Sequence, residues 1–427
     1  MLFRARAQQF YFFSLYLAAF VTSLPFSFGS GSLLLVVFFW LLSLNPKKFA
    51  TNFLNRKLLW FSIAFFLLHA ISYFYSIDKY QSSMDIERKL CFLGLPLVIG
   101  CGPEITLKKL ENILFAFVIG LTLSISICFY NAIHIWSQTG ATKQFFYHAL
   151  VHGFDANAVY FSFYTITSIA ILLLYTWESP PLRSIWLRYF LLSIQIIFLI
   201  LLSSKMLILF FAFILFPLFL IKTKKKQLII TRLFGFIAAI GLFLIIAYTN
   251  NPIHTRFQDI LKNDENKAWM SSDPNGKHFN SLSLRLFLWK TALANIEENN
   301  LWWKGCGNGD VEIYQKRKLE QYYAGKNPDW QTPLWQFNLH NEYMQVLMML
   351  GIPGLSVFLL MIFLPLFFVR KVKHCIVFFI FFLVSAMFML QESAFQTQAA
   401  FLFYSFFLNI FWNVYYSEKE KQLQPSV

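Results

Sequence analysis

The residues most able to do chemistry in this chain are polar side chains that lie beside long apolar runs. His340 and Glu342 belong to a His-Asn-Glu-Tyr segment that leads into an apolar stretch, and Arg285 lies in Ser-Leu-Arg-Leu-Phe-Leu-Trp. Lys205 follows two serines between two apolar runs. An imidazole can act as a base near neutral pH, and a cation at a membrane boundary can be placed for an anionic lipid headgroup.

Each of these residues also has a structural interpretation. Lys205 could instead extend its amine to the headgroups around it. Arg285 could be a solvated helical arginine, although its apolar neighbours favour a paired one, and Arg256 in His-Thr-Arg-Phe is a weaker candidate. A lone histidine such as His340 is more often structural than catalytic near a membrane. Glu342 could be a first-turn acid that the helix dipole favours.

The remaining motifs predict neither a metal nor a cofactor. Gly305, Gly307 and Gly309 form a Gly-x-Gly-x-Gly pattern after a helix, which argues against a dinucleotide site. A turn with N–H groups available for an anion is a better interpretation. His148 and His152 are four residues apart without a third ligand, and the five cysteines have no zinc spacing.

The elements that must position these residues are helices in a membrane. The 427 residues are 57% hydrophobic and only 13% charged, whereas soluble domains carry about 25% charged residues. Runs such as 194–202 and 375–390 are apolar without a polar face, as expected of a helix in lipid. The composition therefore predicts an all-α polytopic membrane protein and excludes an ordinary soluble domain.

The hydropathy pattern predicts about 12 transmembrane helices. They are expected at 9–27, 31–45, 58–76, 90–102, 112–135, 158–177, 189–204, 206–222, 228–248, 344–369, 375–391 and 397–416. Lys and Arg of the short connecting segments fall mostly on one side, which predicts that both termini are cytoplasmic. We therefore attribute the net charge of +15 to topology and predict no nucleic-acid partner.

This pattern divides the chain into three parts. Residues 1–248 hold the first nine spans, residues 249–343 form an outward-facing, periplasmic loop, and residues 344–427 hold the last three spans and a cytoplasmic tail. Within the loop, helical spacing predicts one helix at 282–297 and a second at 310–323. No internal repeat is visible.

Two segments resemble the O-antigen ligase/polymerase family. Residues 340–354, with His-Asn-Glu-Tyr followed by Leu347, Gly351 and Gly354, resemble its His-Asn-x-Tyr-Leu and Gly-x-x-Gly signature. Residues 285–307, with Arg285, Trp289, Asn300-Leu301 and Gly305-x-Gly307, resemble its Arg-x-x-x-Trp and Asn-Pro-Leu-x-Gly-x-Gly stretch. The chain departs from the family at Lys205, where an arginine is common, and lacks the proline of Asn-Pro-Leu.

The resemblance implies a GT-C-like membrane enzyme that transfers a glycan from undecaprenyl diphosphate to a hydroxyl group, without a metal and with inversion. It places the protein in the bacterial inner membrane with a periplasmic active site. His340 and Arg285 would be catalytic, and Lys205, Arg285 and Arg256 would bind the diphosphate. The supporting positions would be Glu342, Asn341, Trp289, Gly305 and Gly307. A cavity lined by His340 and the cations should open between the loop and the spans, with a groove for the polyprenyl tail.

Several acceptors and one other class of function stay open from the sequence. The acceptor could be the lipid A-core sugar, the growing glycan or a protein hydroxyl, and the modest length of the loop favours the lipid A-core. A polyprenyl-glycan transporter is the alternative class, but transporters often show internal repeats and charges at the bilayer midplane. A structural subunit without activity would tolerate replacement of His340, Arg285 and Lys205.

Overall fold

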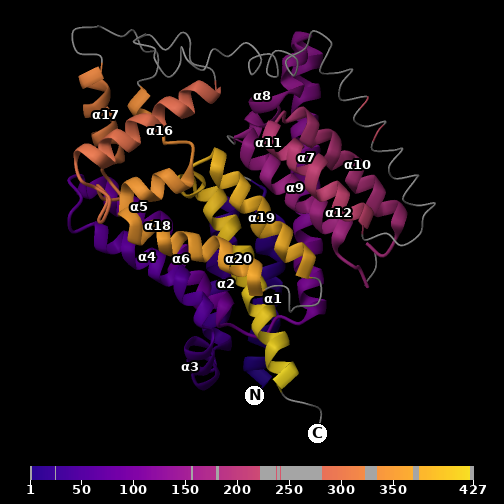
Figure 1. Cartoon of the computed structure of the whole chain (residues 1–427). Helices are drawn as coiled ribbons and strands as arrows, with labels where there is room; N and C mark the ends of the chain where they lie inside the picture. Colours follow the sequence, from indigo (N-terminus) through magenta and orange to yellow (C-terminus); the bar gives the residue numbers. More distant parts are fainter. Residues whose placement is uncertain are drawn as a thin grey trace.

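In the computed structural model, the chain folds into a bundle of helices. The structure describes residues 2–24, 26–154, 157–178, 182–221, 281–322, 334–368 and 375–423, together with residues 237 and 241. No strand occurs among these residues, which agrees with the predicted all-α class. The loop helices α16 and α17 lie at one end of the bundle, and the two termini lie at the other (Figure 1).

The helices follow one another along the chain with short connections. The first group is α1 (Leu2–Val21), α2 (Phe26–Ser43), α3 (Pro46–Asn55), α4 (Trp60–Ser72), α5 (Lys79–Lys89), α6 (Cys91–Leu95), α7 (Leu107–Thr139), α8 (Tyr147–Val151) and α9 (Ala158–Leu174). The second group is α10 (Ile185–Leu201), α11 (Lys205–Phe210) and α12 (Phe216–Ile221). The third group is α16 (Ser281–Glu298), α17 (Val311–Tyr322), α18 (Glu342–Phe368), α19 (Cys375–Gln391) and α20 (Gln398–Leu423).

The described helices include candidates for membrane spans, but fewer than twelve are long and apolar enough to cross a bilayer. Two of them, α7 and α18, are long and apolar enough to cross a membrane, and up to four spans result if each of two bent helix pairs counts as one. Four further apolar helices are shorter. Twelve spans therefore stay a prediction, and the ninth, at 228–248, lies outside the described residues except for two positions.

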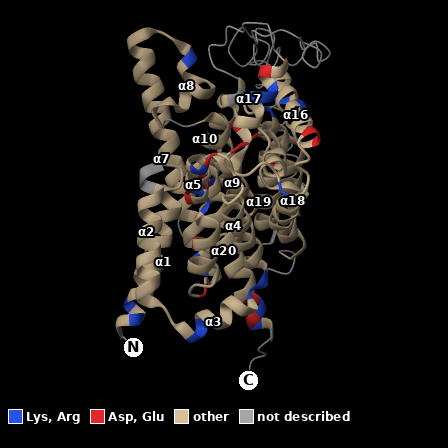
Figure 2. Cartoon of the chain, turned by 90° about the vertical axis from the view of Figure 1, so that its left-hand side faces the viewer, with Lys and Arg blue, Asp and Glu red and all other residues tan. Residues whose placement is uncertain are grey.

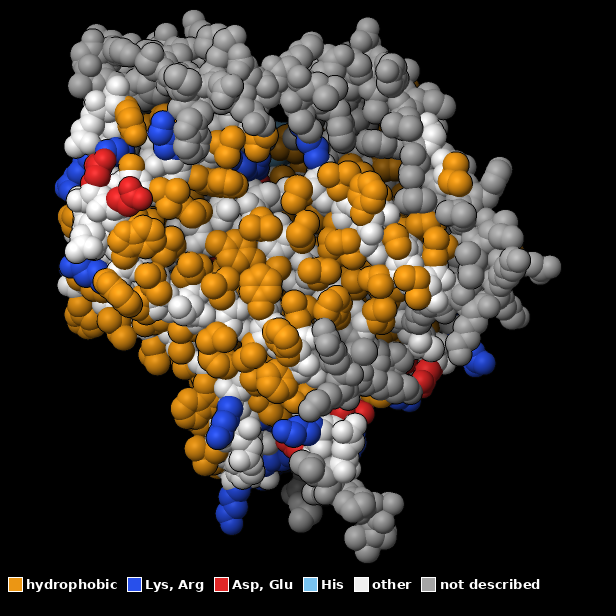
Figure 3. Space-filling model, viewed as in Figure 1, with side chains coloured by type: hydrophobic (Ala, Val, Ile, Leu, Met, Phe, Trp, Pro, Cys, Tyr) orange, Lys and Arg blue, Asp and Glu red, His pale blue; other side chains and the backbone are white. Residues whose placement is uncertain are grey.

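The surface has the pattern expected of a protein in a bilayer. Hydrophobic side chains cover the middle of the face in Figure 3, and charged side chains gather toward its two ends. Exposed large hydrophobic residues are numerous, among them Phe74, Phe213 and Trp186, which are 75–82% exposed. Burying such side chains in lipid is favourable by about 1.5–3 kcal/mol each, so this band is the surface that the membrane would cover.

The predicted loop helices are confirmed, whereas α3, α5 and the five-residue α8 were not predicted. Residues 282–297 and 310–323 correspond to α16 and α17. Helices α3 and α5 are short and polar, and each begins with a side-chain cap. Asn45 accepts a hydrogen bond from the backbone N–H of Lys48, and Asp78 accepts one from that of Gln81. Such caps are local signals that a search for apolar runs does not detect.

Helix α9 lies at the centre of the bundle. All of its residues except Leu173 are buried, and it packs against α7, α10, α11 and α19. Phe163 stacks on Phe388 of α19 with ring centroids 4.5 Å apart, and it meets Phe403 of α20 at 5.0 Å. These aromatic contacts fix the face of α9 that carries Tyr160 and Tyr164, which matters for the cavity described below.

Helix α18 is broken at Gly351, and the loop after α16 repairs the break. Gly351 has φ 66° and ψ −165°, which are not helical values. The carbonyls of Met348 and Met349 instead accept hydrogen bonds from the N–H groups of Cys306 at 2.8 Å and Gly307 at 3.0 Å. The glycine-rich segment therefore has a structural role. Its backbone N–H groups donate to carbonyls that the broken helix α18 leaves without an intrahelical donor.

This role overturns the interpretation of the Gly-x-Gly pattern as an anion site. The N–H of Gly305 donates to Leu301 at 2.8 Å, so the N–H groups of residues 305–307 are all used within the protein. A Cβ at Gly305 would lie 2.3 Å from the backbone of Met349, and one at Gly351 would lie 2.6 Å from the carbonyl oxygen of Trp302. Glycine is required here by close backbone approach and positive φ, not by a ligand.

Helix α5 contributes a buried ion pair below the loop helices. Lys89 and Asp85 are 0% and 1% exposed, and the Lys89 Nζ atom lies 2.9 Å from the Asp85 carboxylate. Arg88 approaches the same carboxylate at 3.5 Å from a partly exposed position. These residues were expected in a short outward loop, but the structure places Lys89 inside the protein, where it needs a nearby anion.

Candidate active site

Glu392 joins two of the predicted site residues. Its Oε1 atom accepts a hydrogen bond from the Arg285 guanidinium at 3.0 Å, and its Oε2 atom lies 3.2 Å from Nδ1 of His340. Arg285 also donates from Nε to the carbonyl of Gln391 at 3.2 Å. The carboxylate is only 4% exposed, whereas Arg285 and His340 are 20% and 22% exposed. A buried acid therefore holds a cation and an imidazole at the edge of the bundle.

The backbone around His340 is unusual and tightly held. His340 has φ 46°, a conformation that costs a non-glycine residue about 1–3 kcal/mol. Its N–H donates to the Asn338 side chain at 3.0 Å. The indole N–H of Trp289 donates to the carbonyl of Leu339 at 2.8 Å, so α16 holds the residue before His340. Surrounding contacts thus impose a strained conformation on His340, as they often do at functional positions.

The two residues after His340 bind the segment that carries Glu392. The N–H of Asn341 donates to Oγ of Ser393 at 3.2 Å, and its side chain accepts from the N–H of Met344 at 3.1 Å, capping α18. The Glu342 carboxylate is buried and accepts from the N–H of Phe395 at 2.8 Å. Residues 340–342 and 392–395 therefore run side by side, with three consecutive contacts between them.

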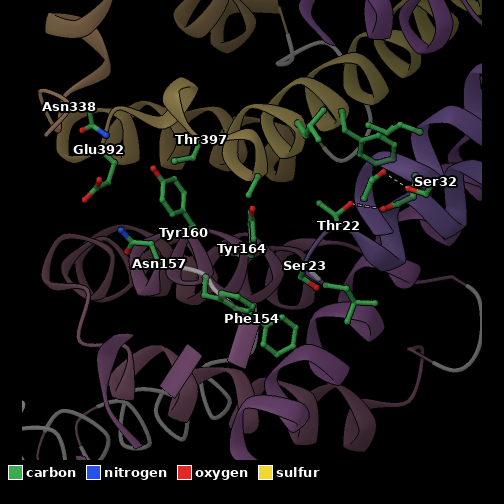
Figure 4. A pocket seen from close by; sticks show the side chains of 18 of the residues that line it. Thr22, Ser23, Ser32, Phe154, Asn157, Tyr160, Tyr164, Asn338, Glu392 and Thr397 are labelled. Carbon is green, nitrogen blue, oxygen red and sulfur yellow. Dashed lines mark hydrogen bonds between the residues drawn. The ribbon is translucent and has the colours of Figure 1, made fainter. Parts of the chain in front are cut away.

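A cavity of about 330 Å³ opens beside this cluster. Figure 4 shows Glu392, Asn338, Asn157, Tyr160 and Thr397 at one end of it and Thr22 and Ser32 at the other. The polar end is formed by the turns around α18, α19 and α20 together with the start of α9. The other end lies between α1, α2, α9 and α20 and includes Leu33, Leu402 and Phe406. The hydroxyl groups of Thr22 and Ser32 donate to backbone carbonyls of α1 and α2, so the cavity leads from a polar cluster to a less polar region among apolar helices.

The predicted site residues do not all meet. Arg285 and His340 come together through Glu392, but of the two only His340 lines the cavity. Lys205 is the first residue of α11, which packs against α9 and α19, and it also does not line the cavity. The expectation that the cations line this cavity is therefore wrong for Arg285 and Lys205. Arg256 lies outside the described residues.

The roles of Glu392 and of the tyrosines of α9 were not predicted from the sequence. One signal was available for Glu392, because it is the only Asp, Glu, Lys or Arg between residues 375 and 417. A single charge in a long apolar region is a candidate for function or for a buried pair. Tyr160 and Tyr164 carry no such signal, because tyrosine is common near membrane boundaries.

Cys306 has the wrong environment for a nucleophile. Its thiol is buried, and burial together with the nearby Asp310 carboxylate raises its pKa above the usual range. The thiol therefore stays protonated near neutral pH, whereas a reactive cysteine needs its thiolate form. Among the described residues, no group of three or more His, Cys, Asp or Glu side chains is arranged to hold a metal ion.

The arrangement suits acid–base chemistry next to an anion. With Nδ1 protonated and donating to Glu392, Nε2 of His340 is left as the nitrogen that can take a proton. The carboxylate fixes this tautomer and stabilises the imidazolium that would form. Arg285 pairs with the same carboxylate, so a cation and an imidazole share one acid.

The fold and the cluster together define a helical membrane protein with a carboxylate-linked histidine and arginine at one end. Residues 189–359 match the family model described as O-antigen ligase. The match covers less than half of the chain, includes both motif segments and supports the resemblance drawn from residues 285–307 and 340–354. A comparison with curated proteins finds no match.

Proposed function

We propose that the protein transfers a glycan from undecaprenyl diphosphate to a hydroxyl acceptor on the periplasmic face of the bacterial inner membrane, and that the acceptor is the lipid A-core. The family match supports a function in lipid-linked glycan transfer of this general kind. The single observation that carries the proposal is the contact of Glu392 with both Arg285 and His340.

The chemistry requires one proton acceptor and a stabilised leaving group. The acceptor hydroxyl loses its proton to Nε2 of His340 as its oxygen bonds to the anomeric carbon of the glycan. The bond from that carbon to the diphosphate oxygen breaks, and the diphosphate leaves with the electron pair. Attack from the side opposite the leaving group inverts the anomeric centre. Glu392 stabilises the imidazolium that results.

The leaving diphosphate needs cations rather than a base. Arg285 is partly exposed beside Glu392, and a guanidinium carries its charge on a planar group whose N–H donors match the oxygens of a phosphate. Lys205 and Arg256 are proposed to assist it, and Lys205 would provide charge without the bidentate geometry of an arginine. The apolar end of the cavity, between α1, α2, α9 and α20, suits part of the polyprenyl tail.

A lipopolysaccharide gel from a deletion strain tests the function. Complementation with the wild-type protein should restore long O-antigen chains on the lipid A-core, and His340→Ala should not. His134→Ala is the matched control, because His134 is exposed on α7 and its side chain contacts Gln138 and Tyr130 of the same helix. Addition of only one repeat in the deletion strain would instead mark a polymerase. An unchanged gel would exclude both, and altered glycoproteins would then mark a protein acceptor.

A further inference from the structure

A second polar cavity lies at the opposite end of the molecule, near the termini. It measures about 180 Å³ and lies between α1, the connection from α2 to α3, and the turn at residues 101–103. Its polar lining residues are Arg4, Gln8, Ser43, Asn45, Lys48 and Asn52. It has no part in the proposed transfer, because the His340 cluster lies at the other end with α16 and α17 (Figure 1).

The two cations of this cavity have no acidic partner among the residues that the structure describes. The acids closest to this end are engaged elsewhere. Glu104 pairs with Lys421 at 2.9 Å, and Glu420 contacts Arg56 at 3.4 Å. Arg4 and Lys48 form no ion pair with any described residue. Two cations that face one small cavity repel each other. An anion bound between them from outside the protein would offset this repulsion.

The walls of the cavity are held in place by the protein. Helix α3 turns away from α2 by 116° and so lies across the end of the bundle. Trp40 meets Phe49 across this bend with ring centroids 5.7 Å apart. The buried Asn52 side chain donates to the carbonyl of Cys101 at 3.0 Å, which ties α3 to the floor of the cavity. Lys48 thus projects from a fixed helix rather than from a loose connection.

Large apolar side chains are exposed on the two helices next to the cavity, α1 and α2. Phe3, Phe38 and Leu41 are 70%, 53% and 55% exposed, although they belong to α1 and α2. Figure 2 shows the charged residues of α1 and α3 at the end of an otherwise uncharged α1–α2 pair. This combination of cations, amides and an adjacent apolar face matches an anionic lipid, whose headgroup is charged and whose chains are not.

We propose that this cavity binds the phosphate group of an anionic phospholipid. Arg4 and Lys48 face the phosphate, and the acyl chains lie along the exposed apolar face of α1 and α2. Arginine provides planar paired donors and lysine a compact charge, which together suit a phosphate diester. The proposal does not depend on the proposed transfer reaction.

Neighbouring residues provide a matched control for the test. Arg6 and Lys47 are exposed on the same two helices but do not line the cavity. The double variants Arg4→Gln/Lys48→Gln and Arg6→Gln/Lys47→Gln therefore lose the same charge from the same region. The purified full-length protein would be titrated with phosphatidylglycerol in phosphatidylcholine nanodiscs or mixed micelles, and the bound lipid would be counted by native mass spectrometry.

We expect the Arg4/Lys48 double variant to lose about 30-fold in phosphatidylglycerol affinity, and the control about threefold or less. Equal losses in both variants would indicate general attraction to a basic surface and would overturn the site. Inorganic phosphate at millimolar concentration should not displace the lipid. Displacement by phosphate alone would show a site for free phosphate and would overturn the assignment to a lipid.

Discussion

Two clusters of cations at opposite ends of the molecule differ in whether the protein supplies their anion. At the end with α16 and α17, Glu392 is buried and contacts both Arg285 and His340. Nearby, Asp85 holds the buried Lys89. At the end with the termini, Arg4 and Lys48 face a cavity without an acid. The protein therefore supplies its own anion where geometry must be fixed, and leaves cations open where an outside anion can bind.

The largest effect is expected where an internal anion is removed from a buried cation. Asp85→Leu would leave Lys89 charged and 0% exposed without its partner, so it should destabilise the fold by about 3–5 kcal/mol. Arg88 should suffer less, because it is partly exposed to solvent. Thermal unfolding of the purified protein in detergent would measure the change.

The double variant Asp85→Leu/Lys89→Met provides the control for this prediction. It removes both charges, and it should recover most of the lost stability because no buried ion is left alone. If the single and double variants are equally unstable, the loss comes from packing in α5 rather than from an unpaired charge. The Asp85–Lys89 pair would then no longer be an example of a cation that the protein stabilises with its own anion.

Removal of the charge on Glu392 should reduce the rate of glycan transfer strongly. Glu392→Gln keeps the shape and one acceptor but loses the anion that stabilises the imidazolium and pairs with Arg285, so we expect about a 10²- to 10³-fold lower kcat. Arg4→Gln at the opposite end should change the rate by about twofold or less. Single-turnover assays with lipid-linked donor would compare them, and full activity of Glu392→Gln would contradict the proposed role.

Sequence patterns identify candidate residues more readily than the partners of those residues. His340, Arg285 and the residues 341–342 stand in short motifs, and the structure joins His340 and Arg285 through a third residue. Glu392 is 52 residues from His340 along the chain and has no motif around it, so only the packing of α19 against α18 brings the two together.

In the fold as well, local patterns predicted the helices, whereas contacts between distant segments could not be predicted. Periodicity predicted α16 and α17, and hydropathy predicted helices at α7, α18, α19 and α20. The use of the N–H groups at Cys306 and Gly307 could not be predicted, because their acceptors belong to a helix that breaks more than forty residues later. The sequence of a glycine-rich segment does not distinguish whether its backbone N–H groups donate to a ligand or to a carbonyl of the protein.

A smaller effect is expected from the contacts that hold Glu392 in place. Ser393→Ala removes the acceptor for the N–H of Asn341, and one lost hydrogen bond of this kind amounts to about 0.5–1.5 kcal/mol, or about threefold to tenfold in rate. The decrease should appear in kcat rather than in KM, because Ser393 acts through Glu392. Ser393→Thr, which keeps the hydroxyl, should retain most of the activity.

A double-mutant cycle distinguishes positioning from general stability. In the Glu392→Gln background, Ser393→Ala should cost little more, because the carboxylate that it positions has already been neutralised. Additive losses would show that Ser393 supports the fold independently of Glu392. The cycle therefore tests whether the effects of Ser393 and Glu392 on the transfer rate are coupled.

The smallest effect is expected from chelation of divalent metals. If a metal were the counterion at the active end, Glu392 and His340 would be its natural ligands, and Arg285 would be repelled from them. The observed 3.0 Å contact of Arg285 with Glu392 instead gives the carboxylate a cationic partner from the protein. We therefore expect EDTA to leave the transfer rate unchanged. Loss of activity with EDTA and its recovery with Mg²⁺ or Mn²⁺ would show that the protein does not supply all the charges at this end.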